Sequence, residues 1–304
     1  MNPTVIENPR IAVVFATMDR SATAVGCLIA LAAQTRPPQL VVIADNCSTD
    51  GTVEALGEID DLPFEFILHR MAANKGNAGG VEEAMEIAFG KGVDAVWILD
   101  DDSWPRARAL EAMLSEPYDG TIALHPVQLD PKSGRFTWPL RIKTDGGWRL
   151  AFSLEEMPGG FRTASRGVWT GVLVSRRIRE TIGPVLGELF IRGEDEEYPW
   201  RMEQAGISHS AVHSAILDHP GPTDIVHWSF LGKHFFFERG LADWKLHYKV
   251  RNMVWLKKRQ SGAVKSLLVF ATYVVAVCRF DGFRKIPLLL TAFGDGWNGK
   301  LGKI

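Results

Sequence analysis

The chain has 304 residues, of which 46% are hydrophobic and 23% charged, and its formal net charge is −2 at pH 7. These values are ordinary for a folded globular protein and exclude fibrous and disordered classes, and the near-neutral charge argues against a binder of duplex nucleic acid. The three cysteines, Cys27, Cys47 and Cys278, have neither the number nor the spacing of a disulfide framework or a metal motif, which favours a reducing compartment.

Residues 1–10 lack a basic stretch followed by an apolar one, so we expect a cytoplasmic protein without a secretory signal. The next hundred residues alternate between strand and helix patterns. Apolar runs predict strands at Ile11–Ala16, Leu40–Ala44, Phe64–Leu68 and Ala95–Leu99, with helices at Ala22–Gln34, after Asp50 and at Val81–Phe89. This alternation predicts an α/β fold with a mostly parallel, Rossmann-like sheet flanked by helices, and ligands then bind beyond the carboxyl ends of the strands.

Three of these predicted strands are followed by carboxylates, and no dinucleotide-binding or P-loop glycine motif follows any of them. The segment Asn74–Gly80 lies between a strand and a helix. We interpret it as a Gly-rich turn, which either brings a ligand to backbone N–H groups or is simply a flexible connection.

An acidic triplet, Asp100-Asp101-Asp102, comes directly after the fourth strand. Adjacent like charges repel, and alternate carboxylates can converge on one hard cation, so the triplet predicts a Mg²⁺ or Mn²⁺ site. Asp45 ends the second strand and could cap its turn or bind a ligand, whereas Asp50 is typical of a helix cap.

A second acidic cluster, Glu194–Glu197, follows a predicted strand at Leu189–Ile191 and opens a predicted helix that ends at Gln204. The helix dipole alone could explain these acids, and a carboxylate there could also serve as a general base toward a sugar hydroxyl. His219 comes later, after a short segment that leads back toward the sheet, and imidazole is a common metal ligand.

The C-terminal part is basic and aromatic: residues 231–304 hold fourteen Lys or Arg and four Asp or Glu. Its apolar run, Leu267–Cys278, is shorter than the roughly 20 residues that span a membrane. Apolar residues recur at helical spacing at Val264, Leu267, Leu268, Ala271, Val275 and Cys278. This pattern fits an interfacial helix on an anionic membrane, and equally a packed helical layer or a dimer contact.

Together these motifs resemble an inverting family 2 glycosyltransferase with the GT-A fold. The residues that carry the resemblance are Thr17, Gln34-Thr35, Pro38, Asp45-Asn46, Ser48-Thr49-Asp50-Gly51-Thr52, Asp100-Asp101-Asp102, Gly193-Glu194-Asp195, Glu197-Tyr198, Arg201 and Gly206. Within the family the chain is most similar to bacterial galactofuranosyltransferases. That likeness rests on Asn74, Gly76, Ala78-Gly79-Gly80, Trp97-Ile98-Leu99, Pro139-Leu140-Arg141, Phe190-Ile191-Arg192-Gly193 and His219-Pro220.

The resemblance implies a role for each of these positions. Asp100 and Asp102 would hold Mn²⁺ or Mg²⁺ on the donor diphosphate, with His219 as a further ligand. Asp45 would contact the uracil, and Thr17, Asn74, Gly76 and Asp101 are further candidates for donor contacts. Asp195 would be the base, with Glu194 and Glu196 as alternatives for that role. Trp138, Arg141, Trp169 and Glu194 are candidates for sugar or acceptor contacts, although core packing explains each tryptophan equally well.

We therefore expect a nucleotide-sugar transferase domain at residues 1–225 and a C-terminal helical region at residues 226–304, for which membrane association is one of the alternatives given above. The expected reaction is metal-dependent transfer of galactofuranose from UDP-galactofuranose to a glycan or polyprenyl-linked acceptor in cell-envelope polysaccharide synthesis, on the inner face of the membrane. A dTDP-rhamnose-dependent transferase and a non-catalytic nucleotide-sugar-binding protein are the alternatives.

Overall fold

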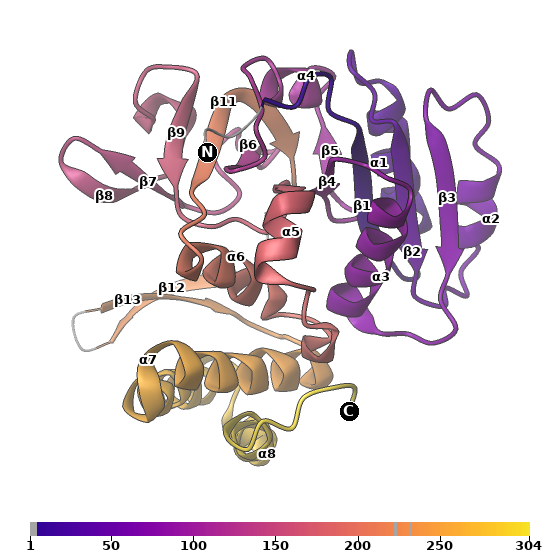
Figure 1. The fold of residues 1–304 in the computed structure, drawn as a ribbon. Helices are drawn as coiled ribbons and strands as arrows, with labels where there is room; N and C mark the ends of the chain where they lie inside the picture. The colour runs from indigo at the N-terminus through magenta and orange to yellow at the C-terminus, as the bar shows by residue number, and fades with distance from the viewer. Residues whose placement is uncertain (1–4, 222–223, 231–232) are drawn as a thin grey trace. The chain divides into compact units, whose positions relative to one another are not determined.

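The computed structural model describes residues 5–221, 224–230 and 233–304. The chain divides into two compact units (Figure 1). The first contains Met1–Leu186 and Tyr198–Gly221, and the second contains Gly187–Glu197 and Pro222–Ile304. A short acidic segment from the middle of the sequence therefore belongs to the C-terminal unit.

The first unit begins with alternating strands and helices, as the sequence predicts. In chain order they are β1 (Ile11–Thr17), α1 (Ser21–Ala32), β2 (Leu40–Asp45), α2 (Thr52–Gly57), β3 (Glu65–Arg70), α3 (Gly76–Gly90) and β4 (Ala95–Ile98). The four strands are parallel and lie in the order β3-β2-β1-β4. Every residue of β1, β2 and β4 is buried, because helices cover both faces of a parallel sheet.

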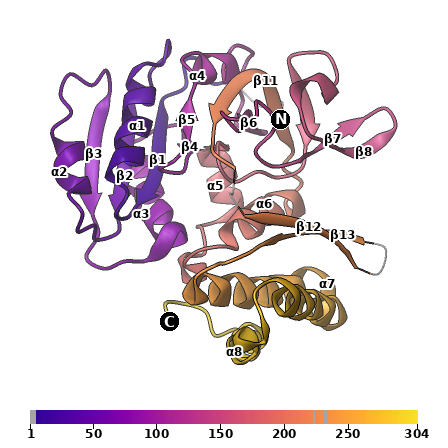
Figure 2. The same cartoon turned by 180° about the vertical axis from the view of Figure 1, so that it is seen from behind.

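The same sheet continues with strands of mixed direction (Figure 2). The further strands of the first unit are β5 (Trp104–Pro105), β6 (Ala123–Leu129), β7 (Leu140–Thr144), β8 (Gly147–Ala151), β9 (Arg162–Ser165), β10 (Leu173–Ser175) and β11 (His209–Asp218). The helices between them include α4 (Ala109–Met113), η1 (Leu154–Glu156) and α5 (Arg176–Ile182). Strand β10 is antiparallel to both β4 and β6, and β11 is parallel to β6. The predicted α/β class is confirmed, with the parallel arrangement concentrated in the first four strands.

Helix α3 begins earlier than predicted, so the prediction of a Gly-rich turn at Asn74–Gly80 is wrong for its glycines. Gly76, Gly79 and Gly80 all lie in the helix. A Cβ on Gly80 would lie 2.7 Å from Cβ of Ala16 on β1 and 2.8 Å from Nδ2 of Asn46. Gly80 is therefore required by the close approach of the helix to the sheet and not by a turn.

The predicted strand at Leu189–Ile191 is also wrong. The segment forms a short 3-10 helix, η2 (Gly187–Leu189), and a bend before α6 (Glu194–Gln204). Phe190, Arg192 and Gly193 have φ of 66°, 61° and 144°. Positive φ is incompatible with an extended strand, so this apolar run packs as a loop.

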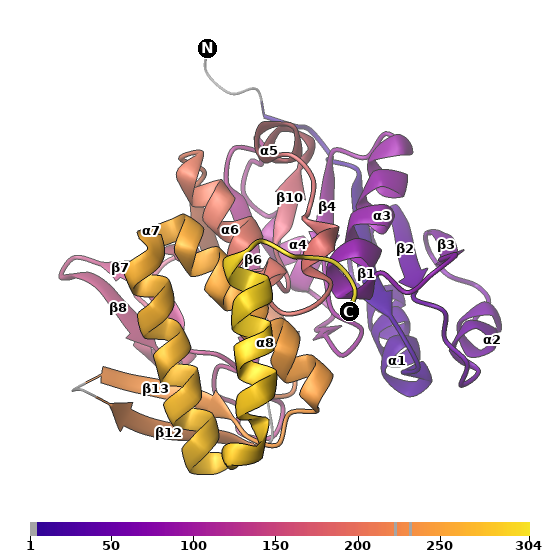
Figure 3. The same cartoon turned by 90° about the horizontal axis from the view of Figure 1, so that it is seen from below.

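The second unit continues with a hairpin and then helices. These are β12 (Ile225–Phe230), β13 (Lys233–Glu238), α7 (Asp243–Phe280), η3 (Phe283–Lys285) and α8 (Ile286–Trp297). Helices α7 and α8 lie side by side (Figure 3), and their shared core includes Leu246, Val250, Val277 and Leu289. Within α7 the backbone leaves helical geometry at Gly262, with φ 85° and ψ 172°, which divides the helix into two segments.

Helix α7 extends beyond the apolar run Leu267–Cys278 in both directions along the chain, mostly toward its N-terminus. By length and composition alone it could cross a membrane, and only 17% of its most apolar stretch is buried. Val264, Leu267 and Leu268 are 71%, 46% and 59% exposed, and Phe283 and Leu290 in the following elements are 75% and 57% exposed. The second unit therefore presents apolar side chains to its surroundings.

Candidate functional site

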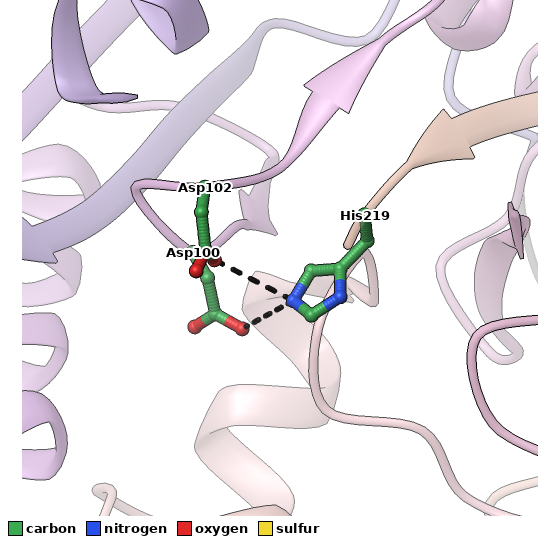
Figure 4. A group of neighbouring side chains, drawn as sticks. All are labelled: Asp100, Asp102 and His219. Carbon is green, nitrogen blue, oxygen red and sulfur yellow. Dashed lines mark ion pairs between the residues drawn. The ribbon is translucent and has the colours of Figure 1, made fainter. Parts of the chain in front are cut away.

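Asp100, Asp102 and His219 lie together at the carboxyl end of the sheet (Figure 4). Nε2 of His219 is 3.7 Å from Oδ2 of Asp100 and 3.5 Å from Oδ1 of Asp102. Each residue offers one ligand atom, and the three atoms lie within 4.8 Å of one another. The structure thus brings together the three residues for which the resemblance implies metal binding.

Strand β5 explains why His219 arrives beside a triplet more than one hundred residues earlier. Trp104 and Pro105 follow the triplet after one residue, Ser103, and pair antiparallel with Asp218 and Leu217 at the end of β11. Arg106 then makes two hydrogen bonds of 2.9 Å to the Asp218 carboxylate. This pairing holds the end of β11, and hence His219, against the triplet.

Asp101 points to different partners from its two neighbours. Its carboxylate accepts a 2.8 Å hydrogen bond from Oγ1 of Thr17 and lies 3.4 Å from Nε of Arg20. Burial raises the pKa of Asp101 to about 7, against the opposing effects of Arg20 and Thr17. Arg20 also pairs with Asp102 at 2.6 Å, so this guanidinium connects two members of the triplet.

Two residues of the site, Arg20 and Thr170, are not among the candidates predicted from the sequence. Oγ1 of Thr170 donates a 2.6 Å hydrogen bond to Oδ2 of Asp100. Arg20 follows the first strand at the edge where the acids gather, so its position was a signal that could have been used. Thr170 lies seventy residues from Asp100, and no local pattern marks it.

The donor set fits a divalent cation. Two carboxylates and one imidazole suit Mn²⁺, and the carboxylates also suit Mg²⁺. Burial lowers the pKa of His219, but the hydrogen bond and charge of Asp100 and the charge of Asp102 outweigh it and raise that pKa overall. The negative charge of the two carboxylates therefore favours a cation at this position.

Asp45 lies at the same edge of the sheet, because it ends β2 and pairs in register with Thr17 at the end of β1. Both carboxylate oxygens of the fully buried Asp45 accept the N–H of Ser48, at 3.2 and 3.1 Å. In this structure the carboxylate caps its own turn, which was one of the two predicted roles.

Asn74 and Asn46 shape the beginning of α3. Oδ1 of Asn74 accepts the N–H of Gly76 at 2.8 Å. Oδ1 of Asn46 accepts the N–H of Lys75 at 3.0 Å, while Nδ2 of Asn46 donates to the carbonyl of Gly76 at 3.2 Å. Asn46 therefore needs both halves of its amide, and a carboxylate could not supply the donor.

The sugar-contact candidates in the first unit lie in different environments. Trp138 is 47% exposed and Arg141 is exposed on β7. Trp169 is buried, and its ring is perpendicular to that of Tyr198 with the centroids 5.7 Å apart, so it packs within the protein. The core-packing alternative thus describes Trp169, while Trp138 and Arg141 remain candidates.

The acidic cluster opens α6 and its acids belong to the second unit. Glu194 is buried, and Glu196 pairs with Lys257 at 2.7 Å. Asp195 is exposed and its Oδ1 accepts the N–H of Gly193 at 2.9 Å. Among the three acids considered for the base, Asp195 is therefore the exposed one that does not pair with Lys257.

Comparison with known proteins assigns the chain to a family and identifies similar proteins. The description "Glycosyl transferase family 2" matches residues 12–183, which is more than half of the sequence. Galactofuranosyltransferase GlfT1 of Mycolicibacterium smegmatis is 27% identical over 207 residues, covering 65% of this chain and 66% of that protein. GlfT1 of Mycobacterium tuberculosis is 29% identical over 211 residues, covering 64% of each. The chain thus spans slightly under two thirds of these relatives.

Solved structures share the fold at low sequence identity. Residues 1–349 of Staphylococcus aureus TarS superpose with a TM-score of 0.57 and 15% identity, covering 94% of this chain and 80% of that one. GalNAc-T7, crystallised with UDP, GalNAc and Mn²⁺, gives 0.55 and 16%, covering 83% of this chain and 48% of that one. These similarities establish the fold.

Proposed function

The chain belongs to glycosyl transferase family 2, and from this premise we propose that it is an inverting, metal-dependent glycosyltransferase. The observation that carries the proposal is the convergence of Asp100, Asp102 and His219 at the edge of the sheet where ligands of α/β proteins bind. The donor is UDP-galactofuranose, and the acceptor is a hydroxyl of a glycan or polyprenyl-linked glycan in cell-envelope polysaccharide synthesis. The likeness to the GlfT1 proteins supports this choice of donor.

Asp100, Asp102 and His219 would hold Mn²⁺ or Mg²⁺. When bound, such an ion supplies positive charge next to the diphosphate, where negative charge develops as the leaving group departs. The side chain of Asp101 has a structural role: it accepts a hydrogen bond from Thr17 at the end of β1 and pairs with Arg20 in the loop after β1, which fixes the triplet to both.

Asp195 is the proposed base, because Glu194 is buried and Glu196 faces Lys257. Its carboxylate accepts the proton of the acceptor hydroxyl while that oxygen bonds to the anomeric carbon. The bond from that carbon to the nucleoside diphosphate breaks in the same step, so the configuration inverts. Desolvation of its carboxyl group and the neighbouring charge of Glu196 raise the pKa of Asp195, which makes its carboxylate a better proton acceptor than that of an ordinary aspartate.

The test is a calorimetric titration of the protein with UDP in the presence of Mn²⁺, repeated with EDTA and with dTDP. Metal-dependent binding of UDP supports the proposal and leads to a transfer assay with UDP-galactofuranose. Preference for dTDP would instead support the rhamnosyl donor, and the absence of binding to either nucleotide would contradict the assigned site.

Asp195→Ala separates catalysis from binding. We expect transfer to fall by about 10²- to 10⁴-fold, the usual contribution of a general base, while metal-dependent UDP binding stays within about twofold. Turnover near the wild-type rate would contradict the assignment of Asp195 as the base.

The same proposal includes a peripheral position on the cytoplasmic face of the membrane. The support is the exposed apolar set on α7, η3 and α8, which has basic neighbours such as Lys265, Arg279 and Arg284. Apolar side chains flanked by cations favour an interface with anionic lipids, where a lipid-linked acceptor would also lie.

A further inference from the structure

The loop that carries the acidic cluster is built into the C-terminal unit. Residues Gly187–Glu197 cluster with the hairpin and helices of that unit, although about ninety residues of the sheet-forming chain precede them after β4. One face of α7 contacts this loop through Tyr248, Arg251 and Asn252, which are spaced i, i+3 and i+4 along the helix.

Asn252 contacts three backbone carbonyls of the loop through a single side-chain nitrogen. Its side chain is fully buried, and Nδ2 lies 2.9 Å from the carbonyl of Leu189, 3.0 Å from that of Ile191 and 2.7 Å from that of Arg192. An amide group has two hydrogens, so three carbonyls share two donors. One side chain thus gathers the backbone of the turn that leads into the acids.

Arg251 orients this amide and also binds the start of the loop. Nε of Arg251 donates to Oδ1 of Asn252 at 2.9 Å, which directs the NH₂ group of Asn252 toward the loop. Its Nη2 donates to the carbonyl of Leu189 at 3.1 Å, and its Nη1 donates to that of Gly302 at 2.6 Å. The buried guanidinium therefore connects helix, loop and C-terminal segment.

The loop needs such external support because its own backbone is unfavourable. Phe190 and Arg192 have positive φ, which costs free energy in residues with a Cβ. Phe190 stacks on Tyr248 with ring centroids 4.8 Å apart. At Gly193 an added Cβ would lie 2.9 Å from Cβ of Asn252, so the loop and helix are in direct contact two residues before Asp195.

We propose that Asn252, held by Arg251, is the positioning residue that sets the place of Asp195 for proton transfer. The inference rests on the proposed function, since it takes Asp195 as the base. Hydrogen bonds from Asn252 hold the carbonyls of Ile191 and Arg192. The next residue, Gly193, donates its N–H to the Asp195 carboxylate at 2.9 Å. Losing the amide releases the turn, and a displacement of about 1 Å at a reacting group is enough to lower a rate by about 100-fold.

The experiment measures transfer kinetics of Asn252→Ala in the full chain, alone and combined with Asp195→Ala. We expect kcat to fall by about 10- to 100-fold, with an unchanged donor KM and unchanged Mn²⁺-dependent UDP binding. In the Asp195→Ala background we expect no further loss, because a residue that acts through Asp195 has nothing left to position. Asn252→Ser, which keeps a smaller polar group, is measured in the same way in case the alanine variant does not fold.

Asn298→Ala is the matched control. Asn298 lies in the same unit, and its side chain donates to the carbonyl of Gly294 in the last turn of α8, away from the loop at Leu189–Arg192, so its loss should leave kcat unchanged. An unchanged kcat in Asn252→Ala, or an equal loss with and without Asp195, would overturn the inference. Wild-type turnover in Asp195→Ala itself would instead overturn the assignment of the base, which distinguishes the two failures.

Discussion

His219 illustrates how single residues complete the site. Its imidazole lies within 3.7 Å of both Asp100 and Asp102, and its own carbonyl accepts a 2.7 Å hydrogen bond from Oγ1 of Thr137. Its backbone N–H donates to the carbonyl of Leu129 at 2.9 Å. The residue is anchored by its backbone, so its ring is available for the site.

His219→Ala is expected to weaken Mn²⁺-dependent binding of UDP by at least about tenfold, because one of three ligand atoms is removed. Calorimetric titration with and without EDTA measures this change. His69→Ala is a suitable control. His69 lies on the edge strand β3, pairs with Glu83 and does not contact the triplet. Equal UDP affinity in wild type and His219→Ala would remove His219 from the ligand set.

At the scale of elements, the site depends on how closely helices and strands approach one another. The first turns of α3 pass against β1 at Gly80, and β5 begins one residue after the triplet and pairs with β11. Gly80 permits the first approach because it has no Cβ, and the two-residue strand β5 holds the end of β11 next to the triplet. The interior of the sheet also contains two buried imidazoles, His125 on β6 and His209 on β11.

Gly80→Ala should lower the free energy of unfolding by about 1–3 kcal/mol, because the new methyl group overpacks the contact with Ala16 and Asn46. Gly90→Ala in the same helix meets nothing within 4 Å and should be neutral or stabilising by up to about 1 kcal/mol. Urea denaturation of both variants compares them. If Gly80→Ala were as stable as Gly90→Ala, the proposed close packing would not hold.

The pH dependence of stability should report the buried imidazoles. Burial lowers the pKa of His125 to about 4, and that of His209 to about 4, from an ordinary 6.5. Below pH 6.5 the unfolded chain takes up protons that the folded chain does not. Each histidine therefore reduces the free energy of unfolding progressively from pH 6.5 to pH 4, by at most about 3 kcal/mol.

His125→Gln tests this linkage. The variant should lose less stability than wild type when the pH is lowered from 7 to 5.5, as measured by chemical denaturation at both values. Identical losses in the two proteins would show that His125 is not held neutral in the fold.

At the scale of the whole molecule, charge is distributed unevenly along the chain. Residues 231–304 carry fourteen Lys or Arg against four acidic residues, in a protein whose total is −2. The same C-terminal part contains the exposed Leu267, Leu268 and Phe283. Basic charge and apolar exposure therefore coincide in one unit, and this coincidence is what the proposed membrane contact requires.

The protein should sediment with phosphatidylglycerol vesicles, and sedimentation should decrease as salt is raised because screening weakens the electrostatic part. The double variant Leu267→Glu/Leu268→Glu should bind less, whereas Leu150→Glu, at an exposed position on β8, should bind like wild type. Binding that is absent, independent of salt or unaffected by the double variant would contradict the membrane contact.

The sequence by itself determined the succession of the first four strands and three helices along the chain. It also determined the α/β class and the presence of acids after three of these strands. These features depend on local periodicity and on where each strand ends, both of which can be read over a few residues. The acidic triplet was recognisable for the same reason, since Asp100 and Asp102 are separated by one residue.

Only the tertiary structure decided which distant groups meet. The pairing of β5 with β11 brings His219 to the triplet, Thr170 reaches Asp100 from seventy residues away, and Asn252 holds the loop at Leu189–Arg192. Apolar content at Leu189–Ile191 suggested a strand, but packing against α7 selects a loop with positive φ. Contacts between distant segments are set by strand order and helix packing, which no short window of sequence contains.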